Sequence, residues 1–126
     1  VKADAYVKFA EITNSKQAIV GFIKSLGRTI PATATTDWLK NEVLSVLEKD
    51  PNYFLEIVTH PQYNDRIFVQ EATEAGAIIR KGNKRYTLDN GSELGDLTDT
   101  IMYLNNPDNQ EVKMRIKAKI DLKQRN

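Results

Sequence analysis

Cysteine, histidine and long apolar runs are scarce in this 126-residue chain, which contains no cysteine and one histidine. Without cysteine the chain forms neither disulfide bonds nor thiolate sites, which suits a reducing compartment. No apolar run approaches the roughly 20 residues of a membrane-spanning helix, and no secretory signal is visible. With 40% hydrophobic and 28% charged residues, the composition is that of an ordinary globular domain. We therefore expect no membrane partner.

Recognisable catalytic and metal-binding patterns are missing as well. His60, the only histidine, lies at a helix end before Pro61, where it favours the negative end of the helix dipole. None of the four serines lies in a nucleophile-elbow context. Counted from Asp89, the acidic stretch DNGSELGDLTD fails the calcium-loop pattern, because Gly91 and Leu94 occupy the third and sixth positions. The glycines of KGNK precede no helix N-terminus that could hold a phosphate. We expect a non-enzymatic protein with no metal and no cofactor.

An excess of one charge sign is also lacking, because the net charge is only +1. The charges nevertheless form alternating blocks along the chain. Their net values are +3 for residues 1–34, −5 for 35–75, +3 for 76–91, −5 for 92–111 and +5 for 112–126. A strong nucleic-acid binder is expected to be uniformly basic. The alternation is equally typical of a surface that meets copies of itself, or a partner that carries both signs.

Helical signals dominate the rest of the chain. Ser15, Thr36 and Asp50 are predicted N-caps, and Pro51 fits the first helical position because it lacks the amide that would have no acceptor there. Gly27 is expected just past the end of the second helix. Apolar residues at helical spacing predict helices over residues 4–12, 16–26, 37–49, 51–60, 66–75 and 96–104.

A β-hairpin is predicted after Gly76, which closes the preceding helix. Its strands are Ala77–Lys81 and Lys84–Leu88, joined by a turn at Gly82-Asn83, and a second turn at Asp89–Gly91 leads to a short third strand at Ser92–Leu94. The predicted fold is a mostly α-helical α+β domain of five or six helices with one hairpin. We predict a single domain, 1–126. It has a helical N-terminal part at 1–50, a helix-turn-helix with the hairpin at 50–94, and C-terminal helices at 96–122.

The run FVQEATEAGAIIRKGNKRYTLDNG resembles the end of a winged-helix domain. In that family a helix closes on a glycine, a strand follows, and a basic tip precedes a return strand that carries an aromatic residue. The resemblance covers about residues 50–91. It implies that the helix before the hairpin enters the major groove of DNA. The side chains in the corresponding positions are Asp65, Arg66, Gln70, Glu71 and Glu74.

The chain departs from that family where DNA would be read. Three of the five corresponding residues are acidic, and carboxylates are repelled by the phosphates that supply most non-specific affinity. The hairpin tip remains basic through Arg80, Lys81, Lys84 and Arg85. These side chains either contact nucleic acid or protect exposed strand edges from pairing with other sheets.

The last segment, VKMRIKAKIDL, fits two structures. Its strict alternation of apolar and charged residues is the strand period, whereas Asp108 followed by Glu111 is typical of a helical capping box. We favour a helix, because the segment is rich in helix formers. A helix would carry two apolar stripes: Val112, Ile116 and Ile120 on one side, and Met114, Ala118 and Leu122 on the other. One stripe is expected to lack packing in the isolated chain and to be covered in an assembly.

The chain also resembles small proteins of tailed bacteriophages in its short caps DPN and NPDNQE, its lack of cysteine and its helical body with one hairpin. That resemblance implies a structural or assembly component of a phage particle, in the bacterial host cytoplasm or the virion. We therefore expect a protein–protein interaction module whose partners are other subunits or copies of itself. The alternative is a winged-helix protein that binds nucleic acid. The candidate contact residues are Arg80, Lys81, Lys84, Arg85, Lys113, Met114, Arg115, Lys117, Lys119 and Leu122.

Overall fold

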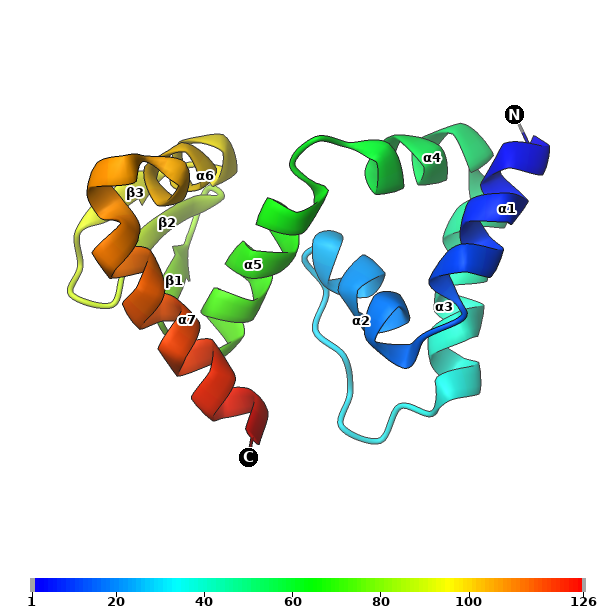
Figure 1. The fold of residues 1–126 in the computed structure, drawn as a ribbon, viewed down its shortest axis with the longest axis horizontal. Helices are drawn as coiled ribbons and strands as arrows, with labels where there is room; N and C mark the ends of the chain where they lie inside the picture. The colour runs from blue at the N-terminus through cyan, green and yellow to red at the C-terminus, as the bar shows by residue number, and fades with distance from the viewer. Residues whose placement is uncertain (1, 126) are drawn as a thin grey trace. The chain divides into compact units, whose positions relative to one another are not determined.

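The computed structural model describes residues 2–125 and shows a mostly helical α+β protein (Figure 1). Within that range there are seven α-helices, one 3-10 helix and three strands. This is one helix more than the five or six expected, and the ambiguous C-terminal segment is the seventh. The elements are α1 Lys2–Ile12, α2 Lys16–Ser25, α3 Thr36–Lys49, α4 Pro51–Thr59, α5 Tyr63–Glu74, β1 Ile78–Lys81, β2 Arg85–Leu88, β3 Glu93–Gly95, α6 Leu97–Asn105, η1 Pro107–Asn109 and α7 Gln110–Arg125.

The chain divides into two compact units, residues 1–67 and 68–126, and the division falls inside α5. Each unit has its own cluster of buried side chains. The single domain with three parts that we predicted stays a prediction. The helix α5 continues across the division without a break. The sequence therefore has no linker there, and its composition does not change.

The N-terminal unit is built from helices that begin at side-chain caps. The Ala18 amide donates to Ser15 Oγ at 3.2 Å, and the Tyr53 amide donates to Asp50 Oδ1 at 3.1 Å, with Pro51 in the first turn as predicted. The cap of α3 is Thr35 rather than Thr36, since the Trp38 amide donates to Thr35 Oγ1 at 3.1 Å. Two adjacent threonines offer the same hydroxyl, and the sequence does not distinguish them.

Aromatic and branched side chains fill the core of this unit. The rings of Phe22 and Phe54, both fully buried, lie 5.2 Å apart between centroids. Tyr63, at the start of α5, is partly buried against the same cluster. Burial raises the pKa of the Tyr63 hydroxyl to about 12, and a side-chain hydrogen bond with Ser25 opposes part of that rise.

In the second unit, α5 closes on Gly76, whose φ is 76°. The Ala77 amide donates to the Ala72 carbonyl and the Gly76 amide to the Thr73 carbonyl, which is the glycine-closed helix end that we predicted. The chain then enters an antiparallel sheet of strand order β1-β2-β3, in which Ile78 pairs with Leu88 and Lys81 with Arg85.

The tip of the hairpin differs from the prediction by one position. The residues in the left-handed region are Asn83 at φ 61° and Lys84 at φ 58°, whereas Gly82 does not have a positive φ. We had placed Gly82-Asn83 at the turn and Lys84 in the strand, but β2 begins only at Arg85. A lysine in this region is strained, because its Cβ approaches the following carbonyl.

The third strand runs from Glu93 to Gly95, one residue later than predicted. Gly95 has φ 101°, and a capped helix follows it directly. The Asp99 amide donates to Asp96 Oδ1 at 2.9 Å, and the Asp96 amide donates to Asp99 Oδ2 at 3.3 Å. These two acidic residues therefore form a reciprocal capping box at the start of α6.

The capping box that we predicted at Asp108 and Glu111 is not the one used at the start of α7. Instead, Asn106 Oδ1 accepts the Asp108 amide at 2.9 Å and begins the short helix η1, which leads into α7. The predicted helix is nevertheless correct. Residues 110–125 are helical throughout, with Ile116 and Ile120 buried in the core of the second unit.

Candidate functional site

Helix α7 has two apolar stripes, one buried and one exposed. Ile116 and Ile120 are buried, whereas Met114 and Leu122 are 72% and 61% exposed and Ala118 is also exposed. Successive residues of a helix are rotated by about 100°. Met114, Ala118 and Leu122 therefore lie on the side of α7 opposite the buried face, and we call them the α7 stripe. Of the two predicted stripes, this is the one without packing in the chain.

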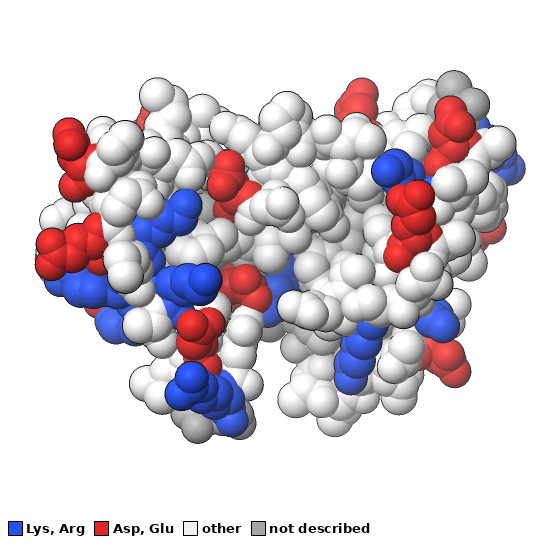
Figure 2. All heavy atoms as spheres, viewed as in Figure 1, with Lys and Arg blue, Asp and Glu red and all other residues white. Residues whose placement is uncertain are grey.

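Basic side chains flank the stripe but differ in what they contact. Lys113 lies 5.6 Å from the centroid of the Phe68 ring and donates to Asn105 Oδ1 at 3.3 Å, so the fold already holds it. Lys119 forms an ion pair with Asp89. Arg115 and Lys117 are exposed and have no hydrogen-bond or ion-pair partner within residues 2–125. Figure 2 shows basic atoms gathered along the region of α7, with acidic atoms between them.

The predicted basic tip of the hairpin is only partly available. Arg80 donates to Gln70 Oε1 at 3.1 Å, and its guanidinium lies 5.6 Å from the centroid of the Tyr86 ring. Lys81, Lys84 and Arg85 are exposed, and in the described part of the chain none has a hydrogen-bond or ion-pair partner. All four side chains of the tip are therefore exposed, but Arg80 already has partners within its own chain.

The helix that would read DNA in a winged-helix protein is engaged by its own chain. Gln70 is buried, with 5% of its surface exposed. Its side chain accepts a hydrogen bond from Arg80 and donates one to Glu74 Oε2 at 3.4 Å. The Gln124 side chain donates to Glu71 from the last turn of α7. Contacts within the second unit thus occupy the central polar residues of this helix.

The other two corresponding residues lie in the N-terminal unit. Arg66 reaches Nε2 of His60 at 3.4 Å, and its Nε atom is buried with no hydrogen-bond partner among the described residues. His60 Nδ1 accepts the Gln62 amide at 3.0 Å. His60 therefore bridges the end of α4 and the start of α5. Asp65 lies one residue before Arg66 and is half-buried.

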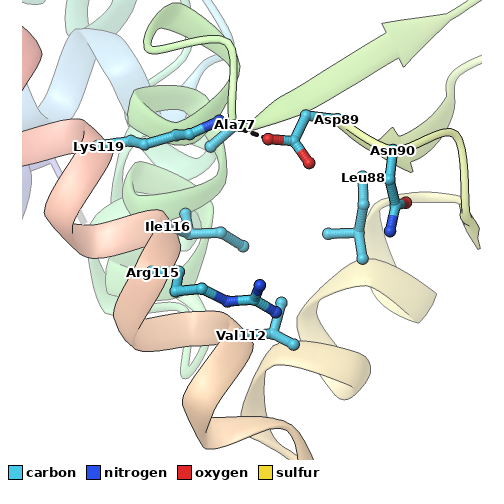
Figure 3. A pocket seen from close by; sticks show the side chains of 8 residues that line it. All are labelled: Ala77, Leu88, Asp89, Asn90, Val112, Arg115, Ile116 and Lys119. Carbon is cyan, nitrogen blue, oxygen red and sulfur yellow. Dashed lines mark hydrogen bonds and ion pairs between the residues drawn. The ribbon is translucent and has the colours of Figure 1, made fainter.

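A pocket of about 160 Å³ lies in the second unit between α7 and the end of β2 (Figure 3). Its apolar wall consists of Ala77, Leu88, Val112 and Ile116. The remaining lining residues are polar or charged: Asp89, Asn90, Arg115 and Lys119. Lys119 lowers the pKa of the Asp89 carboxyl through their hydrogen bond and the attraction of its charge.

Comparisons with protein-family models, with curated proteins and with solved structures found no match to this chain.

Within residues 2–125, no group of three or more His, Asp or Glu residues is placed to hold a metal ion. Over the same range no helix has both the length and the apolar character to cross a bilayer.

Sequence reasoning missed the pocket and most of its rim. Asp89 was predicted as a turn residue, which it is, but its ion pair joins it to a lysine 30 positions away. Leu88 and Ile116 were expected only as a strand residue and a stripe residue. The spacing of Arg115 and Lys119, one turn apart on a helix, is the one local signal that could have placed two cations together.

Proposed function

We propose that the protein is a non-enzymatic protein–protein interaction module that uses the α7 stripe as its contact surface. The observation that carries this proposal is the exposure of Met114 and Leu122, 72% and 61%, on a helix whose opposite face is already buried. Single exposed apolar residues need no explanation, but an apolar stripe that follows one side of a helix over two turns is the usual form of a helical contact site.

The partner that we propose is a second copy of the chain. The α7 stripe cannot pair well with itself, because α7 has six basic and two acidic residues, and two such helices repel each other. The block 92–111 has a net charge of −5 and includes α6, where Met102 is 65% exposed. That surface offers both an apolar side chain and the opposite charge, so it complements the stripe.

A contact between two different surfaces of one chain is head-to-tail and propagates unless its rotation closes a ring. Such repetition suits a component of a larger assembly, such as a bacteriophage particle. Burying the exposed parts of Met114 and Leu122 is worth about 1–2 kcal/mol each. Association costs at least about 4 kcal/mol. The apolar gain of these two side chains therefore does no more than offset that cost, so one contact is expected to be millimolar or weaker, and many copies are needed to make the assembly stable.

Sedimentation over a range of concentrations up to about a millimolar tests this proposal. The average mass of the unmodified chain is expected to rise with concentration. Met114→Glu combined with Leu122→Glu should keep the chain folded and monomeric. Met102→Glu, which changes the complementary surface on α6, should also leave the chain folded and monomeric. An equimolar mixture of these two variants retains one complementary pair of surfaces, so it is expected to form a dimer and nothing larger.

Two controls separate the stripe from general effects. Val7→Glu makes a similar change at a side chain of α1 that is 58% exposed, and should leave association unchanged. Ile116→Glu places a carboxylate in the core and should unfold the second unit. A chain that stays monomeric at every concentration, or a variant mixture that forms no dimer, would contradict the proposal.

Nucleic-acid binding is the second candidate, and the exposed cations at the hairpin tip favour it. Its test is fluorescence anisotropy of a labelled random duplex over a salt series. Binding through the tip should weaken steeply with salt, and it should vanish when Lys81, Lys84 and Arg85 are changed together to Glu, with Arg80 retained because it holds Gln70. The proposed function expects little duplex binding at physiological salt, so tight binding that depends on these residues would favour this second candidate.

A further inference from the structure

The pocket beside α7 combines an apolar wall with an accessible guanidinium. Ala77 and Ile116 are almost fully buried, and Leu88 and Val112 are half-buried. In Figure 3 the side chain of Arg115 extends from α7 over Val112 toward the strand end that carries Leu88. The guanidinium therefore lies beside a space whose lining is partly apolar and partly polar.

The two cations of the rim are in different states. Lys119 is held by Asp89, as the dashed line in Figure 3 marks. Arg115 lies one helical turn earlier and makes no hydrogen bond or ion pair within residues 2–125, although its charge also helps to lower the pKa of the Asp89 carboxyl. Its planar fork of N–H donors matches the two oxygens of a carboxylate. Since Asp89 neutralises one of the two cations, the rim has a net charge of +1, which suits a monoanion better than a dianion.

We propose that this pocket binds a small monocarboxylate with a compact apolar body, whose carboxylate pairs with Arg115 while the body lies against the apolar wall. The volume sets the size of the body. An apolar cavity of about 150 Å³ holds one benzene molecule, and this pocket measures about 160 Å³. An aromatic ring or a branched group of about six carbon atoms therefore fits, whereas a nucleotide does not. The proposal does not depend on the α7 stripe, because Val112 and Ile116 form the part of the apolar wall that α7 supplies.

Benzoate is the probe for this proposal, and a ligand of its size in an open pocket is expected to bind with a dissociation constant of roughly 1–10 mM. Amide chemical shifts of the isotope-labelled full chain are followed by NMR at constant ionic strength. The expected result is a saturable change confined to residues 77, 88–90 and 112–119. Benzamide has the same ring but no charge, and acetate has the charge but no ring, so each should bind at least tenfold more weakly.

Variants then assign the binding to the rim. Arg115→Gln should weaken benzoate binding at least tenfold, because it removes the charge-assisted pair. Lys117→Gln makes the same change of charge on the same helix, away from the pocket, and should leave the affinity within about twofold. Asp89→Asn removes a competing carboxylate and releases Lys119, so it should strengthen binding severalfold. That gain cannot arise from damage to the fold.

The outcomes that overturn the proposal are equally definite. Shifts that do not saturate, or that spread over the whole surface, would mean that benzoate has no site. Equal binding of benzamide and benzoate would remove the role of Arg115, as would an unchanged affinity in the Arg115→Gln variant. An equal loss in the Lys117→Gln variant would reduce the effect to the general positive charge of α7.

Discussion

Gly95 joins the sheet to α6 in a conformation that only glycine adopts easily. Its φ is 101°, and the next residue, Asp96, begins the capping box. A Cβ at this position would lie 2.4 Å from Oδ2 and 2.8 Å from Cβ of Asp99. We therefore expect Gly95→Ala, at the buried end of β3, to be strongly destabilising, although it adds only one methyl group.

The magnitude follows from two terms. A non-glycine residue at such a φ costs about 1–2 kcal/mol of backbone strain. The Asp99 side chain must also move away, and it then loses the reciprocal bonds of the capping box, which costs about 0.5–2 kcal/mol. Together the free energy of unfolding should fall by about 2–4 kcal/mol for the unit that contains residues 68–126.

Urea unfolding measures this loss, with the Thr100 amide signal as the reporter of the second unit. That amide donates to the Asp96 carbonyl at 2.9 Å, so it lies at the site of the change. With a slope of roughly 1–3 kcal/mol per molar urea, the midpoint should fall by about 1–2 M. Gly82→Ala is the matched control, because no atom lies within 4 Å of the added Cβ and φ is not positive.

The two terms can be separated by a double-mutant cycle. Asp99→Ala removes the cap alone and should cost about 0.5–2 kcal/mol. If the clash with Asp99 is real, Gly95→Ala with Asp99→Ala should cost less than the sum of the single changes. Strict additivity would show that the close approach to Asp99 carries no energy. A Gly95→Ala variant as stable as the Gly82→Ala control would refute the reasoning altogether.

Two further predictions concern backbone strain and alkaline pH. Lys84→Gly should stabilise the second unit by about 0.5–1 kcal/mol in urea unfolding, because Lys84 has a φ of 58°; Lys84→Ala keeps the strain and should give no gain. Tyr63 has a pKa of about 12 in the folded chain against an ordinary value near 10, so its contribution to stability is complete below pH 10 and is lost as pH rises from 10 to 12. Because the side chain is only partly buried, this loss should be about 1–2 kcal/mol, smaller than the full shift implies. Tyr63→Phe, compared at both pH values by chemical unfolding, should lack that part of the decline; an equal decline would contradict the assignment.

Signals that act within one turn of the chain were the most predictable. Ser15 and Asp50 cap their helices because each side-chain oxygen accepts a hydrogen bond from the amide three residues later, which has no acceptor within the helix. Gly76 ends α5 for an equally local reason. The one-residue error at Thr35 has the same origin, since the two threonines are locally equivalent.

The C-terminal segment was harder to predict because its pattern fits two periods. An apolar residue at every second position also places apolar residues at i and i+4 on two sides of a helix. Burial of Ile116 and exposure of Met114 are decided by the rest of the second unit, which no local pattern contains. The division of the chain inside α5 was likewise invisible, because neither composition nor a breaker marks it.

The candidate sites depend on side chains that meet across long separations. Arg80 is exposed, as expected for a basic tip, but its guanidinium also donates to Gln70 on the preceding helix. Lys119 was predicted to flank a contact stripe, and it pairs instead with Asp89 across the pocket. A sequence shows which groups carry charge, whereas the folded chain decides which of those charges are already satisfied.

The exposed methionines make both proposed contact surfaces sensitive to oxidation. Met102 and Met114 are the only methionines of the chain, and with no cysteine present they are its only sulfur atoms. Conversion to the sulfoxide turns a flexible apolar side chain into a polar one. Since neither sulfur is packed in the core, peroxide should add two oxygen atoms by mass and leave the helical circular dichroism unchanged. Oxidants could thus separate copies of this chain without unfolding them, and a reductase for methionine sulfoxide would restore the contact.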